Sequence, residues 1–315
     1  MNLTELKEKL LSAEAIKSLH FENEVKLELQ NLKWNNLHSP YFEDPSSRKL
    51  RELDIISRMY FEKEIKKDVR IISDIVLMIE VKSNSNYHVI CDGAIDKNHT
   101  PKEDNHQIWF GYDSYMRNKK IIEILKKTEL KEQEKRQIIK AFNKWLFPDS
   151  CSIVGDYCPD SFDDIKRFSA FRETNIGATK DLDNSVIWKS FLSLNSACEG
   201  YELFEWANME SDFLGDIDYA IVWKTSPLKA LKSFFRQRAL RHTSLHKILV
   251  VDSKLWEYSS EIYPIGYFRL IQRSVMGHDE NWIDIVNTEY LSQYLANVTT
   301  HYKEFFQKQQ MKRFL

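Results

Sequence analysis

The pattern of hydrophobic and polar residues predicts a helix followed by three strands at the start of the chain. Leucines and valines recur at helical spacing over residues 3 to 33. Residues 34 to 41 look extended, and Leu50 to Phe61 is rich in the β-branched and aromatic residues that strands favour. The stretch Val69 to Lys82 contains five consecutive apolar residues, which is typical of a central strand covered on both faces. We expect residues 62 to 68 to connect these last two strands as a hairpin.

The pattern changes after residue 83. Residues 84 to 115 show no clean period, residues 116 to 147 are strongly helical, and residues 148 to 182 contain scattered prolines and glycines. We interpret residues 84 to 180 as an inserted helical lobe.

Helices and strands alternate again in the last part of the chain. The pattern predicts helices at residues 184 to 206 and 283 to 310. It predicts strands at Tyr219 to Trp223, His246 to Trp256 and Tyr267 to Arg273. Strands that alternate with helices indicate a mixed α/β sheet.

This organisation divides the chain into three parts. Residues 1–83 would form the first part of a core, residues 84–180 the inserted lobe, and residues 181–315 the remainder of the core with C-terminal helices.

Composition excludes several classes of protein. The 45 basic and 47 acidic side chains give a formal net charge of −2, so the overall charge does not favour nucleic-acid binding, which then depends on local patches. Neither GxGxxG nor GxxxxGK[ST] occurs, which removes the main support for a dinucleotide or P-loop site. The N-terminus lacks the apolar segment of a signal peptide, and no apolar run could span a bilayer. With four widely spaced cysteines, we expect a cytoplasmic protein with reduced thiols and no membrane partner.

The candidate chemistry lies at the end of the apolar strand. Glu80 and Lys82 are two residues apart on a strand, so both project from one face. Such charges are costly beside a buried strand unless they are paired or bound to a metal. A hairpin could bring Asp54 beside Glu80, and a cation such as Mg²⁺ or Mn²⁺ would relieve the repulsion between the two carboxylates. Asp54, Glu80 and the carbonyl oxygen of Val81 are therefore the candidate metal ligands, with Lys82 placed to orient water or to stabilise charge on a phosphate.

Each of these assignments has an alternative. Glu80 and Lys82 could instead form an ion pair on a solvated face, and Asp74 competes with Asp54 for the ligand role. Glu24, on the helix before the strands, could hydrogen-bond water near the metal. Glu22 and Glu28 compete with Glu24, which could also be a solvated helix position.

Three short segments together resemble the PD-(D/E)xK nuclease superfamily. They are Phe21-Glu22-Asn23-Glu24-Val25, Arg51-Glu52-Leu53-Asp54-Ile55-Ile56 and Ile79-Glu80-Val81-Lys82-Ser83. The resemblance implies a restriction-endonuclease-like αβββαβ core with a central mixed sheet. It also implies Mg²⁺-dependent hydrolysis of phosphodiester bonds, with DNA the expected substrate and restriction or anti-phage defence the expected setting. Two features depart from the usual pattern: Leu53 replaces a proline, and a long insertion separates Lys82 from the next core helix.

A second candidate surface is basic. Ser226-Pro227 is typical of a helix start, and Lys229, Lys232 and Arg236 would share one face of that helix. Arg238 and Arg241 extend the patch. We predict contact with the phosphate backbone of nucleic acid, and the alternative is a solvated face.

Two other functions remain open at this point. The same fold could bind nucleic acid without cutting it, or the mixed-charge helix at residues 120 to 145 could bind a partner subunit. A homodimer is also considered, because such nucleases often dimerise to cut both strands.

Overall fold

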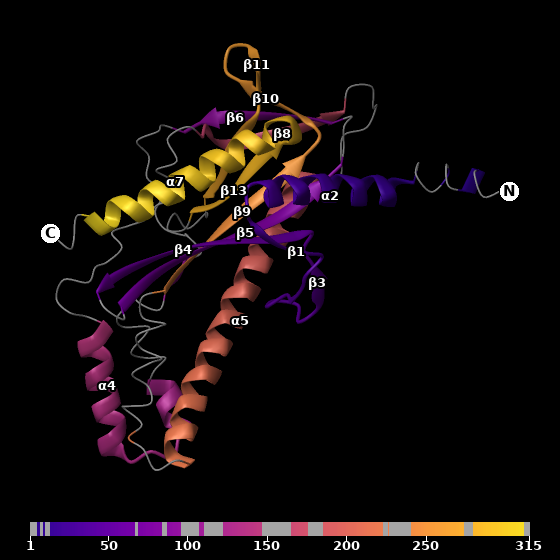
Figure 1. The fold of residues 1–315 in the computed structure, drawn as a ribbon. Coiled ribbons are helices and arrows are strands. Elements are labelled where there is room, and N and C mark those ends of the chain that lie inside the picture. Colours follow the sequence, from indigo (N-terminus) through magenta and orange to yellow (C-terminus); the bar gives the residue numbers. More distant parts are fainter. Residues whose placement is uncertain are drawn as a thin grey trace.

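The computed structural model is a mixed α/β structure built on one large sheet (Figure 1). It describes residues 13–66, 69–83, 87–95, 107–109, 122–146, 165–175, 185–222, 226, 241–273 and 280–311, together with residues 5, 6 and 9. No helix in this part of the chain is long and apolar enough to cross a membrane.

Among the described residues, eleven strands form the sheet, in the order β1-β4-β5-β9-β13-β12-β8-β6-β10-β11, with β7 paired to β9. The strands on the side of the candidate site are β1 (Asn35–His38), β4 (Ile55–Lys66), β5 (Val69–Lys82), β7 (Gln107–Trp109) and β9 (Arg241–Val251). The others are β6 (Tyr87–Ala94), β8 (Arg167–Asn175), β10 (Lys254–Tyr258), β11 (Ile262–Ile265), β12 (Tyr267–Arg273) and β13 (Glu280–Asn287). A separate two-stranded sheet pairs β2 (Tyr41–Glu43) with β3 (Leu50–Glu52).

The centre of the sheet is mixed. Strand β4 is antiparallel to both β1 and β5, while β9 is parallel to both β5 and β13. The bounds of β5 and β12 confirm the predictions for those two segments. The carboxyl ends of the parallel strands β5 and β9 lie at the same edge, where Lys82 pairs in register with Val251.

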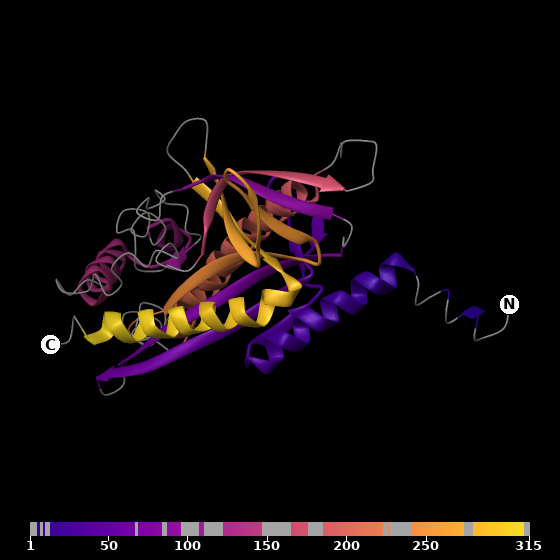
Figure 2. The same cartoon turned by 90° about the horizontal axis from the view of Figure 1, so that it is seen from above.

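Helices cover both faces of the sheet (Figures 1 and 2). Helices α2 (Glu14–Asn31) and α7 (Leu291–Met311) lie on one face, where the Ser292 hydroxyl donates to the Glu28 carboxylate at 2.5 Å. Helix α5 (Val186–Val222) packs on the other face and extends beyond the sheet, with α4 (Glu132–Leu146) beside its far half. A 3₁₀ turn, η2 (Thr288–Tyr290), precedes α7.

Side chains on alternate sides of β5 join two separate cores. Ile75, Leu77, Ile79 and Val81 pack with residues of α2 and α7, while Val76 and Met78 pack with residues of α5. This alternation follows from the two-residue period of a strand. It places Glu80 and Lys82 on the α5 side.

Several sequence-based predictions were wrong at element boundaries. The expected hairpin connection over residues 62 to 68 is mostly strand, since β4 continues to Lys66. Tyr219 to Val222 belong to α5, because Phe213, Ile217 and Ala220 are fully buried at helical spacing and extend the helix.

Two further predictions merged separate elements. The stretch 246 to 256 is two strands, β9 and β10, separated by a bend at residues 252 and 253. Residues 283 to 287 belong to β13 rather than to the C-terminal helix, because Trp282, Ile283 and Ile285 are buried in the sheet. The segment 84–180, interpreted as an inserted lobe, contributes β6, β7 and β8 to the main sheet. Its helix α4 lies beside α5 instead.

Candidate active site

A break between two strands positions Asp54. The chain was expected to be continuous strand from Leu50 to Phe61, but β3 ends at Glu52 and β4 starts at Ile55. The amide of Leu53 donates to the Pro40 carbonyl at 3.0 Å, and the amide of Ser39 donates to the Asp54 carbonyl at 2.9 Å. Ile55 pairs with Ile79, so Asp54, one residue earlier, lies level with Glu80 on the neighbouring strand.

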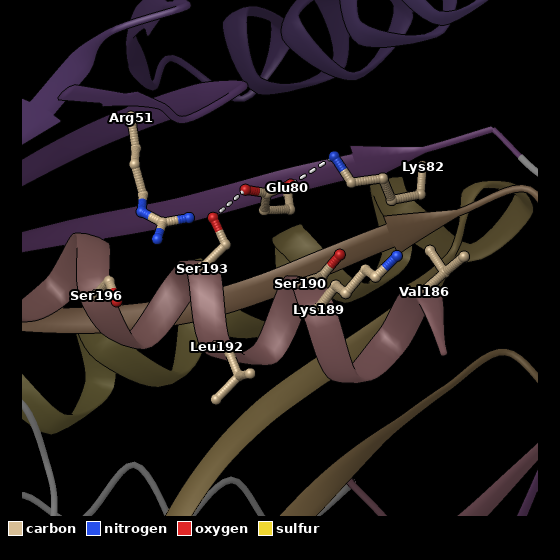
Figure 3. Close-up of a pocket in the computed structure, with 9 residues that line it drawn as sticks. All are labelled: Arg51, Glu80, Lys82, Val186, Lys189, Ser190, Leu192, Ser193 and Ser196. Carbon is tan, nitrogen blue, oxygen red and sulfur yellow. Dashed lines mark hydrogen bonds and ion pairs between the residues drawn. The ribbon is translucent and has the colours of Figure 1, made fainter. Parts of the chain in front are cut away.

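The carboxylates of Asp54 and Glu80 meet at one ammonium group. Lys82 Nζ lies 3.1 Å from Asp54 Oδ2 and 2.5 Å from Glu80 Oε2. The amide of Val81 donates to the same Asp54 oxygen at 2.7 Å, and the Ser193 hydroxyl of α5 donates to Glu80 Oε1 at 2.7 Å. The predicted convergence of Asp54, Glu80 and Lys82 is therefore present (Figure 3 shows the Lys82–Glu80–Ser193 part).

Burial dominates the electrostatics of this group. The Glu80 side chain is only 6% exposed, and burial raises its pKa, with the Asp54 charge adding to the shift and Lys82 opposing it. Burial alone would lower the pKa of Lys82, but Glu80 and Asp54 together outweigh it, and the net pKa of Lys82 is raised. Lys82 therefore stays protonated at neutral pH, and Glu80 binds a proton more tightly than a free glutamate side chain does.

A cavity of about 550 Å³ opens beside these residues. Glu80 and Lys82 form one wall, and the first turns of α5 form the facing wall (Figure 3). Three of the lining residues are cations (Arg51, Lys82 and Lys189) and one, Glu80, is an acid. The cavity therefore suits an anionic ligand.

The donor set fits a hard divalent cation. Asp54 and Glu80 each keep free lone pairs beyond the contacts above, because a carboxylate accepts about four hydrogen bonds. The amide and carbonyl of a strand residue point to the same side, so the Val81 carbonyl faces the Asp54 side together with its amide. Within the described residues, no group of three or more His, Cys, Asp or Glu side chains is placed to hold a metal. Two carboxylates and a carbonyl are nevertheless a typical protein share for Mg²⁺, which completes its shell with water and substrate phosphate.

Three other acidic residues considered for the metal site each contact a different basic side chain. Asp74 is buried and binds Arg58, with Nη2 at 2.5 Å from Oδ2, six residues along β5 from Glu80. Glu24 is 55% exposed and pairs with His20 at 3.7 Å, away from the three central residues. Glu22, its competitor, is half-buried and contacts His38 at 3.1 Å. Because His38 pairs with Ile55, the contact with His38 places Glu22 beside the start of β4.

The basic residues of the predicted helix are not among those that the structure describes. Lys229, Lys232, Arg236 and Arg238 lie outside the described residues. Arg241, which was expected to extend the basic patch, is the first residue of strand β9. It pairs in register with Ile72, near the start of β5, whereas Glu80 lies near the end of that strand. Arg241 is therefore remote from the cluster of Asp54, Glu80 and Lys82.

The sequence interpretation missed the α5 wall of the cavity. Ser190, Ser193 and Ser196 recur every three residues in the first half of α5, and all three line the cavity. Three hydroxyls at a spacing of three residues on a helix that packs against the sheet were a detectable signal, because polar groups at a packed face need partners.

The chain matches no protein-family model, no curated protein and no solved structure.

Proposed function

We propose that the chain is a metal-dependent nuclease of the PD-(D/E)xK type that hydrolyses phosphodiester bonds, with DNA as the expected substrate. The observation that carries the proposal is the contact of both Asp54 and Glu80 with the Lys82 ammonium, at the carboxyl end of a central strand. Two carboxylates and a lysine beside an anion-compatible cavity are the groups that phosphodiester hydrolysis needs.

The order of the elements supports the same proposal. Helix α2, strands β1, β4 and β5, helix α5 and strand β9 follow one another as αβββαβ, apart from the small β2-β3 sheet and the long segment before α5. Strands β1, β4 and β5 are antiparallel neighbours, and β9 is parallel to β5. The element order and the mixed sheet support the αβββαβ core that the resemblance implies.

Asp54, Glu80 and the Val81 carbonyl would hold the cation, Mg²⁺ or Mn²⁺. When bound, the cation would polarise the phosphodiester and lower the pKa of water. Lys82 remains protonated between the carboxylates and is placed to stabilise the negative charge that develops on the phosphate. Ser193 holds Glu80 through its second carboxylate oxygen, which fixes the orientation of that ligand.

Cleavage of supercoiled plasmid, with Mg²⁺ or with EDTA, tests the proposal. Wild-type protein should nick or linearise the plasmid with Mg²⁺ only, and Glu80→Gln should abolish the reaction. Glu24→Gln is a matched control, because the Glu24 side chain is 55% exposed and pairs with His20. Binding of the plasmid without cleavage under any metal condition would instead make the chain a nucleic-acid-binding module, and equal cleavage by wild type and Glu80→Gln would exclude the proposed site.

A further inference from the structure

The cavity wall opposite Glu80 and Lys82 is built from one helix. The first turns of α5 present Lys189, Ser190 and Ser193 to the cavity. Ser193 already donates to Glu80. Lys189 and Ser190 have no role in holding the carboxylates, so their presence in this wall needs a separate explanation.

Ser190 is a buried hydroxyl without a partner. Its residue is 2% exposed, and within the described part of the chain its Oγ makes no hydrogen bond. Leaving such a group unsatisfied destabilises the folded state, so buried hydroxyls almost always have a partner. Figure 3 shows the hydroxyl pointing from α5 toward the strand that carries Glu80 and Lys82. The missing partner is therefore expected to be a ligand in the cavity.

The charges around Ser190 favour an anionic ligand, because three cations and one acid, Glu80, line the cavity. Lys189 is exposed beside it, and Arg51 lines the cavity from the other side while pairing with Asp44. The amides at the start of α5 are already used, since Ile187 donates to Glu173 and Trp188 donates to the Ser185 hydroxyl, both at 2.9 Å. Side chains, and not the helix end, would therefore bind the anion.

We infer that Ser190 and Lys189 bind a backbone phosphate of the nucleic-acid strand, across the cavity from Glu80 and Lys82. The Ser190 hydroxyl donates to a non-bridging phosphate oxygen and Lys189 neutralises its charge, which holds the strand against the catalytic wall. This inference rests on the proposed function for the identity of the ligand, but it concerns binding and not bond cleavage.

Binding of a short fluorescent oligonucleotide in EDTA tests the inference without cleavage. The affinities for single-stranded DNA, duplex DNA and single-stranded RNA of one sequence are compared. The comparison shows which kind of nucleic acid the protein prefers. Ser190→Ala should weaken binding about tenfold while leaving the unfolding temperature unchanged or slightly higher, because the variant removes an unsatisfied hydroxyl. Lys189→Ala should weaken binding and reduce the slope of log Kd against log salt by about 0.7–0.9, the value for one phosphate contact.

Two exposed positions provide matched controls. Ser260→Ala and Lys126→Ala should bind like wild type. If Ser190→Ala and Lys189→Ala also bind like wild type while the wild-type protein cuts DNA, the inference is overturned and the proposed function stands. If the two variants bind more weakly but the wild-type protein never cuts with Mg²⁺, the inference stands and the proposed function fails. Absence of binding by wild type to any of the three oligonucleotides also overturns the inference.

Discussion

Asp54 Oδ2 lies 3.1 Å from Lys82 Nζ, although Asp54 lies in the break between β3 and β4 and Lys82 ends β5. The same Asp54 oxygen also accepts a hydrogen bond from the amide of Val81. The contact holds the Lys82 ammonium between two carboxylates. It also means that a divalent cation bound by Asp54 and Glu80 would sit beside a fixed positive charge. Lys82 should therefore serve the reaction while opposing the binding of metal.

Substitution of Lys82 separates these two effects. Lys82→Ala should lower the cleavage rate by about 10²–10³-fold, the cost of removing one group that stabilises charge in the transition state. The same variant should bind Mg²⁺ as tightly as wild type or more tightly, because the competing ammonium is gone. Rates on plasmid DNA and a calorimetric Mg²⁺ titration measure the two quantities, with Lys254→Ala on the exposed start of β10 as the control. A variant that loses cleavage and metal binding together would contradict this division of roles.

Glu80 should cost stability when no cation is bound. Burial raises the pKa of Glu80, so its carboxyl group binds a proton more tightly in the folded protein than in the unfolded chain. The free energy of unfolding should then fall as pH rises above the ordinary glutamate pKa of about 4.3. At about pH 8 without metal, Glu80→Gln should unfold at the same temperature as wild type or a higher one.

Addition of Mg²⁺ should make wild type unfold at a higher temperature than Glu80→Gln. A ligand at a hundred times its Kd stabilises the folded state by about 2.7 kcal/mol, so wild type should gain unfolding temperature with Mg²⁺ while Glu80→Gln gains little. Thermal denaturation with MgCl₂ and with EDTA checks both statements. The account would be wrong if Glu80→Gln were clearly less stable than wild type in EDTA, or gained as much from Mg²⁺.

A second buried cluster should make the fold sensitive to acid. Asp284 contacts Arg269 Nε at 2.6 Å and His246 Nε2 at 2.7 Å, and all three side chains are at most 3% exposed. Burial lowers the pKa of His246 although Asp284 opposes the shift. Burial alone would raise the pKa of Asp284, but Arg269 holds it well below its usual value.

The unfolded chain therefore binds more protons at both positions. Stability should fall as pH drops below about 6.5, the usual histidine pKa, by up to about 1.4 kcal/mol per pH unit, and fall further near the usual aspartate pKa of about 3.9. Urea denaturation of wild type and His246→Gln at a series of pH values measures this loss. His246→Gln should flatten the pH dependence near pH 6, whereas the exposed His20→Gln should leave it unchanged. If the free energy of unfolding changes equally with pH in wild type and in His246→Gln, then His246 is not the cause of the loss of stability.

The central strand and its charged end were predictable from local pattern. Five consecutive apolar residues indicate a strand covered on both faces, and the period of two places Glu80 and Lys82 on one face. The position of Asp54 followed from the expected hairpin, although the chain breaks between β3 and β4 where a continuous strand was expected. The break matters because it leaves Asp54 outside the ladder, so that its side chain can accept the Val81 amide.

Contacts between distant segments were not predictable. Ser193 and Glu80 are 113 residues apart, and their contact depends on where α5 crosses the sheet. The choice between Glu22 and Glu24 depends on which side of α2 faces β1, and this side was ambiguous because neighbouring helix positions both carry acids. Tyr219 to Val222 has strand-like residues, yet burial of Ile217 and Ala220 keeps the segment helical.

A titration of Mn²⁺ into wild type and Asp54→Asn, followed by the electron paramagnetic resonance of free Mn²⁺, tests most directly whether the two carboxylates share a cation. The substitution keeps the shape of the side chain and removes one negative charge from the pair. Wild type should bind Mn²⁺ in a saturable way, and Asp54→Asn should bind it at least about tenfold more weakly while remaining folded. Equal binding by the two proteins, or no saturable binding by wild type, would contradict a metal site at Asp54 and Glu80.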